Sequence, residues 1–129
     1  PGQIVLVGSL AGLAASPGTR LYNATKFGLR GFSLSFSQEL EGTGVGCSLV
    51  APGFIRDAGM FHDGGIELPA GVRTKAPQDV ADGVVRAITH RPAEVFVAPI
   101  ELRLASTLAT VAPALSATIQ KKLDVANRR

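Results

Sequence analysis

The stretch Gln3–Val7 has the sequence QIVLV, a short continuous apolar run that is rich in β-branched residues. Such a run predicts a strand that is buried on both faces of a sheet. Two segments of the same kind follow, VGCSLVA at Val45–Ala51 and EVFVA at Glu94–Ala98. Helices are predicted between them, over Leu21–Leu40 and over Pro77–His90. The order strand, helix, strand, helix, strand is that of a parallel α/β sheet.

The connections that leave the carboxyl ends of the predicted strands are where ligand chemistry is expected. The stretch Gly8–Arg20 follows the first strand, and a longer glycine-containing stretch, Phe54–Lys75, follows the second. Open parallel sheets bind their ligands at this edge, and long loops in compact domains usually have a function.

Beyond Pro99 the chain predicts two helices that separate near Pro113. One apolar stripe is expected along them, made of Leu104, Leu108, Val111 and Leu115. Packing of this stripe on the body of the protein or on a second subunit is favoured over a role at a membrane surface.

Composition narrows the class of protein. A length of 129 residues suits one domain, and a hydrophobic content of 46% argues against disorder. The formal net charge is only +3, and the basic residues gather only at the end of the chain, at Lys121, Lys122, Arg128 and Arg129. No aromatic residues lie among these charges, so a solvated helix end is favoured and no nucleic-acid partner is expected.

Cysteine and histidine usage excludes further classes of site. The single cysteine, Cys47, is expected to be a buried thiol, and it suits the reducing environment of a cytoplasmic protein. The histidines His62 and His90 lie far apart, so no metal site is expected. No apolar run long enough for a transmembrane segment is present in these 129 residues, and the residues from Pro1 onward are not expected to be a signal peptide.

Tyr22 and Lys26 lie four residues apart at the start of the first predicted helix, which places them on one face of it. A phenol exchanges protons poorly at neutral pH, because its ordinary pKa is about 10. A neighbouring ammonium group favours the phenolate and makes that exchange easier. Ser9 follows the first strand, where its hydroxyl could bind the same substrate oxygen. Taken singly, the Tyr22–Lys26 pair is more simply interpreted as an exposed helix contact, and Ser9 as a turn residue.

Four short segments follow one another in a set order: GQIVLVGSLAG at Gly2–Gly12, YNATK at Tyr22–Lys26, GFS at Gly31–Ser33 and APG at Ala51–Gly53. Together they resemble the second half of a short-chain dehydrogenase/reductase, over residues 2–98. Ser9 precedes the tyrosine by 13 residues, which is the spacing of the catalytic serine and tyrosine in that family. The resemblance is to the single-domain dehydrogenase branch, rather than to the larger sugar-nucleotide epimerases.

The resemblance implies an enzyme, an oxidoreductase that uses NAD or NADP. It would move a hydride between the nicotinamide and a small carbonyl or alcohol substrate. Tyr22 would be the proton donor or acceptor, and Lys26 would activate the phenol and hold a ribose hydroxyl. Ser9 would bind the substrate carbonyl.

The resemblance also assigns residues around the second strand end. The backbone at Pro52, Gly53 and Ile55 would border the nicotinamide ring, together with Tyr22 and Lys26 as cofactor-binding residues. Phe54 would contact the substrate, and residues 54–72 would form a lid over it.

The fold class implied is α/β, the C-terminal half of a Rossmann-like doubly wound parallel sheet followed by C-terminal helices. Residues 1–98 would be the catalytic half of the domain, and residues 99–129 a helical tail. A full-length protein would be a homo-oligomer that associates through the helix Leu21–Leu40.

Two departures from the family pattern bear on function. Arg56 and Asp57 occupy the region where the family often has a cofactor-binding threonine. The chain also has no glycine-rich dinucleotide fingerprint and no residue that selects NAD or NADP. We therefore expect a fragment that is inactive alone, or alternatively a non-catalytic truncated or dimerisation module that no longer binds cofactor.

Overall fold

The computed structural model describes residues 1–55 and 74–127. Its three strands and the two helices between them begin and end within one residue of the predicted bounds, and two helices follow Pro99 as predicted. The elements also include a short 3₁₀ turn in the stretch that the sequence predicts as a loop. They are β1 Gly2–Val7, the 3₁₀ turn η1 Leu10–Gly12, α1 Arg20–Glu39, β2 Val45–Pro52, α3 Pro77–His90, β3 Glu94–Val97, α4 Ile100–Val111 and α5 Pro113–Asn127.

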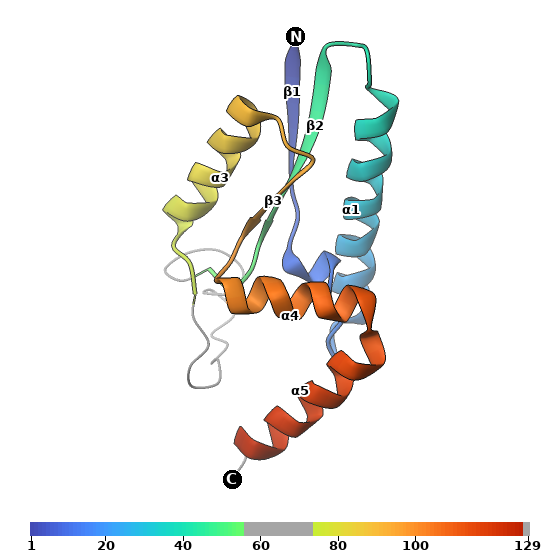
Figure 1. The fold of residues 1–129 in the computed structure, drawn as a ribbon, viewed down its shortest axis with the longest axis vertical. Helices are drawn as coiled ribbons and strands as arrows, with labels where there is room; N and C mark the ends of the chain where they lie inside the picture. Colours follow the sequence, from blue (N-terminus) through green and yellow to red (C-terminus); the bar gives the residue numbers. More distant parts are fainter. Residues whose placement is uncertain (56–73, 128–129) are drawn as a thin grey trace.

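The three strands form one parallel sheet in the order β1-β2-β3, which confirms the α/β class (Figure 1). Gly2 lies opposite Val45 and Val7 opposite Val50, so β1 and β2 are paired along their length. Because all strands run the same way, their carboxyl ends lie at one edge of the sheet. Helix α4 crosses that edge, beside η1, and α5 extends away from the sheet (Figure 1).

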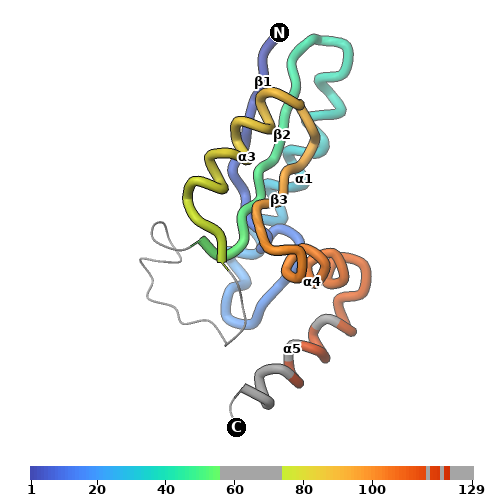
Figure 2. The backbone as a smooth tube through the Cα atoms, turned by 60° about the vertical axis from the view of Figure 1, so that its left-hand side comes forward, coloured from blue at the N-terminus to red at the C-terminus, as the bar shows by residue number. Residues whose placement is uncertain are grey.

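Helices α1 and α3 cover opposite faces of the sheet, as Figures 1 and 2 show. Val50 and Ala87 are fully buried between β2 and α3, where β-branched side chains fill the interface. On the other face, the buried Cys47 thiol lies 3.7 Å from the Ser33 hydroxyl of α1. The buried thiol expected from the sequence is therefore confirmed.

This arrangement has an unusual consequence for the hand of the connections. The connections that contain α1 and α3 both step in the same direction across a parallel sheet. With their helices on opposite faces, the two crossovers have opposite hands, and about 98% of such crossovers in proteins are right-handed. One of the two is therefore the rare left-handed form.

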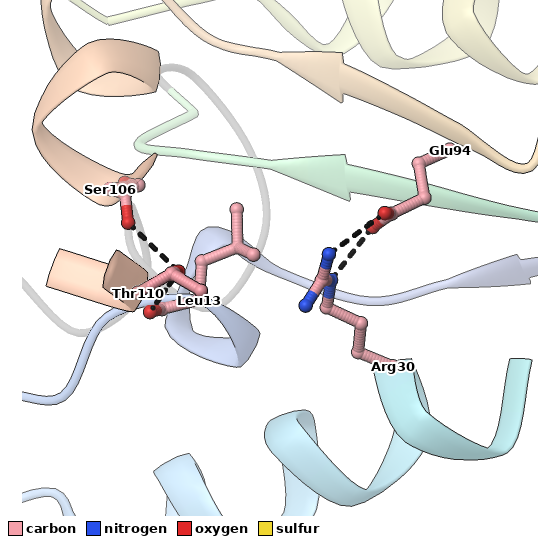
Figure 3. Close-up of polar contacts among 5 residues, drawn as sticks. All are labelled: Leu13, Arg30, Glu94, Ser106 and Thr110. Carbon is pink, nitrogen blue, oxygen red and sulfur yellow. Dashed lines mark hydrogen bonds and ion pairs between the residues drawn. The ribbon is translucent and has the colours of Figure 1, made fainter. Parts of the chain in front are cut away.

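An ion pair joins α1 to the first residue of β3 (Figure 3). The Arg30 guanidinium donates from Nε to one oxygen of Glu94 at 2.8 Å and from Nη2 to the other at 2.9 Å. These hydrogen bonds raise the pKa of Arg30 and outweigh the opposing effect of partial burial. The pair has the bidentate geometry that guanidinium and carboxylate groups favour.

We expect Glu94→Gln to lower the free energy of unfolding by about 1 kcal/mol, because one charge-assisted hydrogen bond and the ionic attraction are lost. The pair is only partly buried, at 26% and 16% side-chain exposure, so solvent screening limits the effect. Urea unfolding measures it. Glu41→Gln, at an exposed position, is the matched control and should change little; equal stability of the two variants would contradict the assignment.

The C-terminal helices differ from the sequence prediction in one respect. Helix α4 ends at Val111 and α5 begins at Pro113, which confirms the predicted split, but most of the expected apolar stripe is exposed. Leu104, Val111 and Leu115 are 65%, 79% and 51% exposed. The described body of the protein therefore leaves most of these three side chains uncovered, and packing of the stripe on a second subunit stays a prediction. No helix in the described parts of the chain is both long enough and apolar enough to cross a bilayer.

A polar contact fixes the carboxyl end of α4. The Thr110 hydroxyl of α4 lies 2.9 Å from the Leu13 carbonyl and 3.0 Å from the Ser106 carbonyl of its own helix (Figure 3). Leu13 belongs to the connection that follows β1, so α4 is held against the loop that contains Ser9.

Candidate functional site

Tyr22 and Lys26 lie in the first two turns of α1 and are in contact. The Lys26 ammonium nitrogen Nζ lies 5.5 Å from the centroid of the Tyr22 ring, within cation–π range. Tyr22 is 37% exposed, and within the described residues its hydroxyl has no hydrogen-bond partner. The four-residue spacing therefore produces the pair on one helix face that the sequence predicts, with the phenol accessible.

Ser9 lies between the end of β1 and η1. Its hydroxyl oxygen Oγ accepts a hydrogen bond from the Ala11 N–H at 3.1 Å and so caps the 3₁₀ turn. A hydroxyl that accepts in this way keeps its own proton available for donation. The turn role and the substrate-binding role of Ser9 are therefore compatible.

The loop that contains Ser9 packs directly on α1, and we call residues 8–19 the serine loop. A Cβ atom placed on Gly12 would lie 2.8 Å from the Lys26 carbonyl oxygen. Any larger residue at this position would push the loop away from the helix. Gly12 thus brings the serine loop into contact with the turn of α1 that carries Lys26.

Asn23 makes the second contact between the serine loop and α1, and the sequence analysis did not single it out. It is 7% exposed. Its Nδ2 donates to the Ala11 and Ala14 carbonyls at 2.9 and 3.0 Å. Its Oδ1 accepts from the Ser16 N–H at 3.3 Å and from the Thr19 hydroxyl at 2.7 Å. An asparagine beside the tyrosine is the only signal the sequence offers, and it is weak.

The turn after β2 lies against the serine loop. The Gly53 N–H donates to the Val97 carbonyl at 3.0 Å, which extends the pairing of β2 and β3. A Cβ atom on Gly53 would lie 3.2 Å from both Leu10 and Ala98 side chains. The turn is thus joined to the serine loop, and the serine loop is joined to α1.

Phe54 and Ile55 continue this turn. The Phe54 carbonyl accepts a hydrogen bond from the Lys75 N–H at 3.0 Å, and Ile55 forms a parallel bridge with Lys75. The predicted lid beyond Ile55, with Arg56 and Asp57, lies outside the described residues. The candidate cofactor-binding residues Pro52, Gly53 and Ile55 therefore lie at the carboxyl edge, where ligands of parallel sheets bind.

A groove of about 230 Å³ lies between β3, α4 and the serine loop. It is lined by Leu13, Phe96, Ile100, Arg103, Leu104 and Thr107. Within this lining, the Arg103 guanidinium lies 5.9 Å from the centroid of the Phe96 ring. Neither Tyr22 nor Lys26 lines this groove, so it is separate from the candidate catalytic pair.

The residues present fit one end of a nicotinamide cofactor. The half-buried Lys26 ammonium and the accessible Tyr22 phenol can both donate hydrogen bonds to ribose hydroxyl groups. No glycine-rich turn that could cradle the phosphates occurs in the sequence. Metal chemistry has no comparable candidate, since no three His, Cys, Asp or Glu side chains gather in residues 1–55 and 74–127.

Comparisons with known proteins agree with the fold described above. The family model described as short chain dehydrogenase matches residues 1–65, which is half of the chain. The ketoacyl reductase HetN of a Nostoc species is 38% identical over 96 residues, which are 74% of this chain and 33% of that protein.

Two solved structures share the fold. A short chain dehydrogenase from Burkholderia cenocepacia, in complex with NADP, matches over 90% of this chain and 46% of its own, with a TM-score of 0.70 and 22% identity. One from Burkholderia phymatum, in complex with NAD, matches over 84% and 48%, with a TM-score of 0.60 and 22% identity. The chain thus spans between a third and a half of the length of these proteins. With its parallel α/β sheet and the matched family model, the chain belongs to the short chain dehydrogenase family.

Proposed function

We propose that this chain is the catalytic, C-terminal half of an oxidoreductase that transfers a hydride between NAD or NADP and a carbonyl or alcohol substrate. Residues 1–98 would complete a Rossmann-like domain, and residues 99–129 would be its helical tail. The single observation that carries the proposal is the contact of Lys26 with Tyr22 at the start of α1, beside the loop of Ser9.

Two further observations support the proposal that this chain is part of a longer protein. It covers no more than half of the relatives described above. Strand β1 has no second neighbour in the described sheet, and its Ile4 and Val7 side chains are 37% and 51% exposed. Apolar side chains at an unpaired sheet edge are what a missing strand and its helices would cover. We call the protein with that amino-terminal half the full-length protein.

The proton chemistry falls to three residues of this chain. In carbonyl reduction the bound nicotinamide cofactor supplies the hydride. As the C–H bond forms, the carbonyl π electrons move to oxygen, and the Tyr22 hydroxyl gives its proton to that oxygen. The Lys26 ammonium stabilises the phenolate that remains, and solvent returns the proton. The Ser9 hydroxyl donates a hydrogen bond to the same oxygen and stabilises its developing charge.

The remaining candidates would border these groups. The backbone at Pro52, Gly53 and Ile55 would lie along the nicotinamide ring, and Lys26 would also hold a ribose hydroxyl. Phe54 would contact the substrate. Association into a homo-oligomer through α1 is proposed too, since Leu21, Phe27 and Phe32 are 78%, 44% and 58% exposed on this helix. A cytoplasmic location would suit such an enzyme.

The proposal is tested by turnover of a panel of carbonyl compounds with NADH and NADPH, using the full-length protein. A 3-oxoacyl compound belongs in the panel because one relative is named a ketoacyl reductase. We expect turnover of at least one compound, and a loss of about 10²–10³-fold in kcat for Ser9→Ala. Undiminished turnover by that variant would contradict the role of Ser9.

A second candidate function is a non-catalytic truncated or dimerisation module. It is favoured by the absence of a phosphate-binding turn from the sequence and by the exposed apolar side chains of α1. Isothermal titration of the 129-residue chain with NAD and NADP distinguishes the two. Micromolar binding would contradict the non-catalytic module, whereas no binding by the chain together with turnover by the full-length protein fits a fragment.

A further inference from the structure

The three groups of the proposed site come from two different segments. Tyr22 and Lys26 share α1, so the helix itself fixes their separation. Ser9 belongs to the serine loop, and its position relative to them depends on how that loop docks on α1. Catalytic groups must be held to within about 0.5 Å by residues that support them, so the docking contacts matter for the chemistry.

Asn23 provides most of the polar docking. Its four hydrogen bonds reach positions 11, 14, 16 and 19, and thus run along most of the serine loop. Apart from the short turn η1, the loop has no regular structure that would satisfy its own backbone. The buried Asn23 amide therefore satisfies backbone groups of the loop that a strand or helix would otherwise satisfy, and so orders this segment.

The chemistry of the contact suits asparagine in particular. The amide offers two donor protons and one acceptor oxygen with two lone pairs, and all four positions are used. Aspartate would have the same shape but could not donate to the Ala11 and Ala14 carbonyls. It would leave both carbonyls facing a buried negative charge, which is costly. A leucine would satisfy none of the four partners.

We propose that Asn23 is a positioning residue, which holds the serine loop on α1 and so keeps the Ser9 hydroxyl where it can bind the substrate oxygen beside Tyr22. The inference rests on the proposed function for its catalytic consequence. A misplacement of about 1 Å can cost about 10²-fold in rate, even when no reacting group is removed.

The kinetic test is a double-mutant cycle in the full-length protein with Asn23→Asp, Ser9→Ala and the double variant. We expect Asn23→Asp alone to lower kcat by about 10–10²-fold. In the Ser9→Ala background the same change should cost less than about threefold, because the group that Asn23 positions is already gone. Equal losses in both backgrounds would overturn the inference.

Amide hydrogen exchange supplies a readout that does not depend on activity. Asn23→Asp should speed exchange about tenfold at the loop amides of Gly12, Leu13, Ala14 and Ser16. The β2 amides should keep their protection. Equal acceleration in β2 would show general destabilisation and overturn a local role. Thr25→Val is the matched control, because Thr25 is exposed on α1 and its hydroxyl bonds the Leu21 carbonyl of the same helix. It should leave exchange unchanged.

If Asn23→Asp does not fold, Thr19→Val carries the same test. It removes the hydroxyl that donates to Asn23 Oδ1 and that also lies 3.0 Å from the Ser16 carbonyl, and it leaves the other three hydrogen bonds of Asn23. A several-fold loss in kcat that disappears in the Ser9→Ala background would support the inference, and an unchanged kcat would overturn it. No turnover by the wild-type protein would instead refute the proposed function, and hydrogen exchange alone would then decide whether Asn23 docks the loop.

Discussion

Tyr22→Phe is expected to lower kcat of the full-length protein by about 10²–10⁴-fold, because the group that transfers the proton is removed. KM should change little, since the proton transfer belongs to the transition state. The fold should be unaffected, because the aromatic ring remains and the hydroxyl has no hydrogen-bond partner within the described residues. Initial rates of cofactor oxidation at saturating substrate measure the effect.

The control for this prediction is Thr25→Val, on the next turn of the same helix. Its hydroxyl bonds only within α1 at 3.0 Å to the Leu21 carbonyl, so the variant should keep the wild-type rate. If Tyr22→Phe retains the wild-type rate as well, the phenol is not the proton carrier and the proposed mechanism is wrong.

Gly83→Leu is expected to lower the free energy of unfolding by about 3 kcal/mol or more. Gly83 is buried in the middle of α3, where the helix lies close to the sheet. Even a Cβ atom there would lie 2.8 Å from Val97 and 3.5 Å from Val50 and Val95. A leucine would force the helix off the sheet, because side chains packed on three sides cannot all move aside. Urea unfolding of the full-length protein measures the loss.

Ala81→Leu is the matched control, since Ala81 is exposed on the same helix. Leucine favours the helix nearly as much as alanine, so stability should change by less than about 0.5 kcal/mol. Similar unfolding midpoints for the two leucine variants would show that α3 does not approach the sheet as closely as described.

Local sequence patterns predicted the helices and strands because each is encoded over a few adjacent residues. The runs Gln3–Val7 and Val45–Ala51 lie in strands β1 and β2, and Pro77 begins α3 where a proline costs no hydrogen bond. The Tyr22–Lys26 contact was predictable for the same reason, since a spacing of four fixes a shared helix face.

The long-range contacts could not be predicted in this way. Arg30 and Glu94 are 64 residues apart, and nothing local marks them as partners. Asn23 bonds mostly to backbone groups of a loop, and every residue carries such groups, so no sequence pattern identifies them. The opposite faces taken by α1 and α3 depend on how the whole chain crosses the sheet, and the usual right-handed rule predicts one shared face.

The central claim is that a serine hydroxyl and a lysine-activated phenol act on one substrate oxygen. A crystal structure of the full-length protein with NADP or NAD and a substrate analogue tests it most directly. The account predicts Ser9 Oγ and Tyr22 Oη both within about 3.2 Å of the same ligand oxygen, and Lys26 Nζ within hydrogen-bond distance of a ribose hydroxyl. A bound analogue whose oxygen lies beyond about 3.5 Å from Tyr22 Oη, with Lys26 turned away from the ribose, would contradict it.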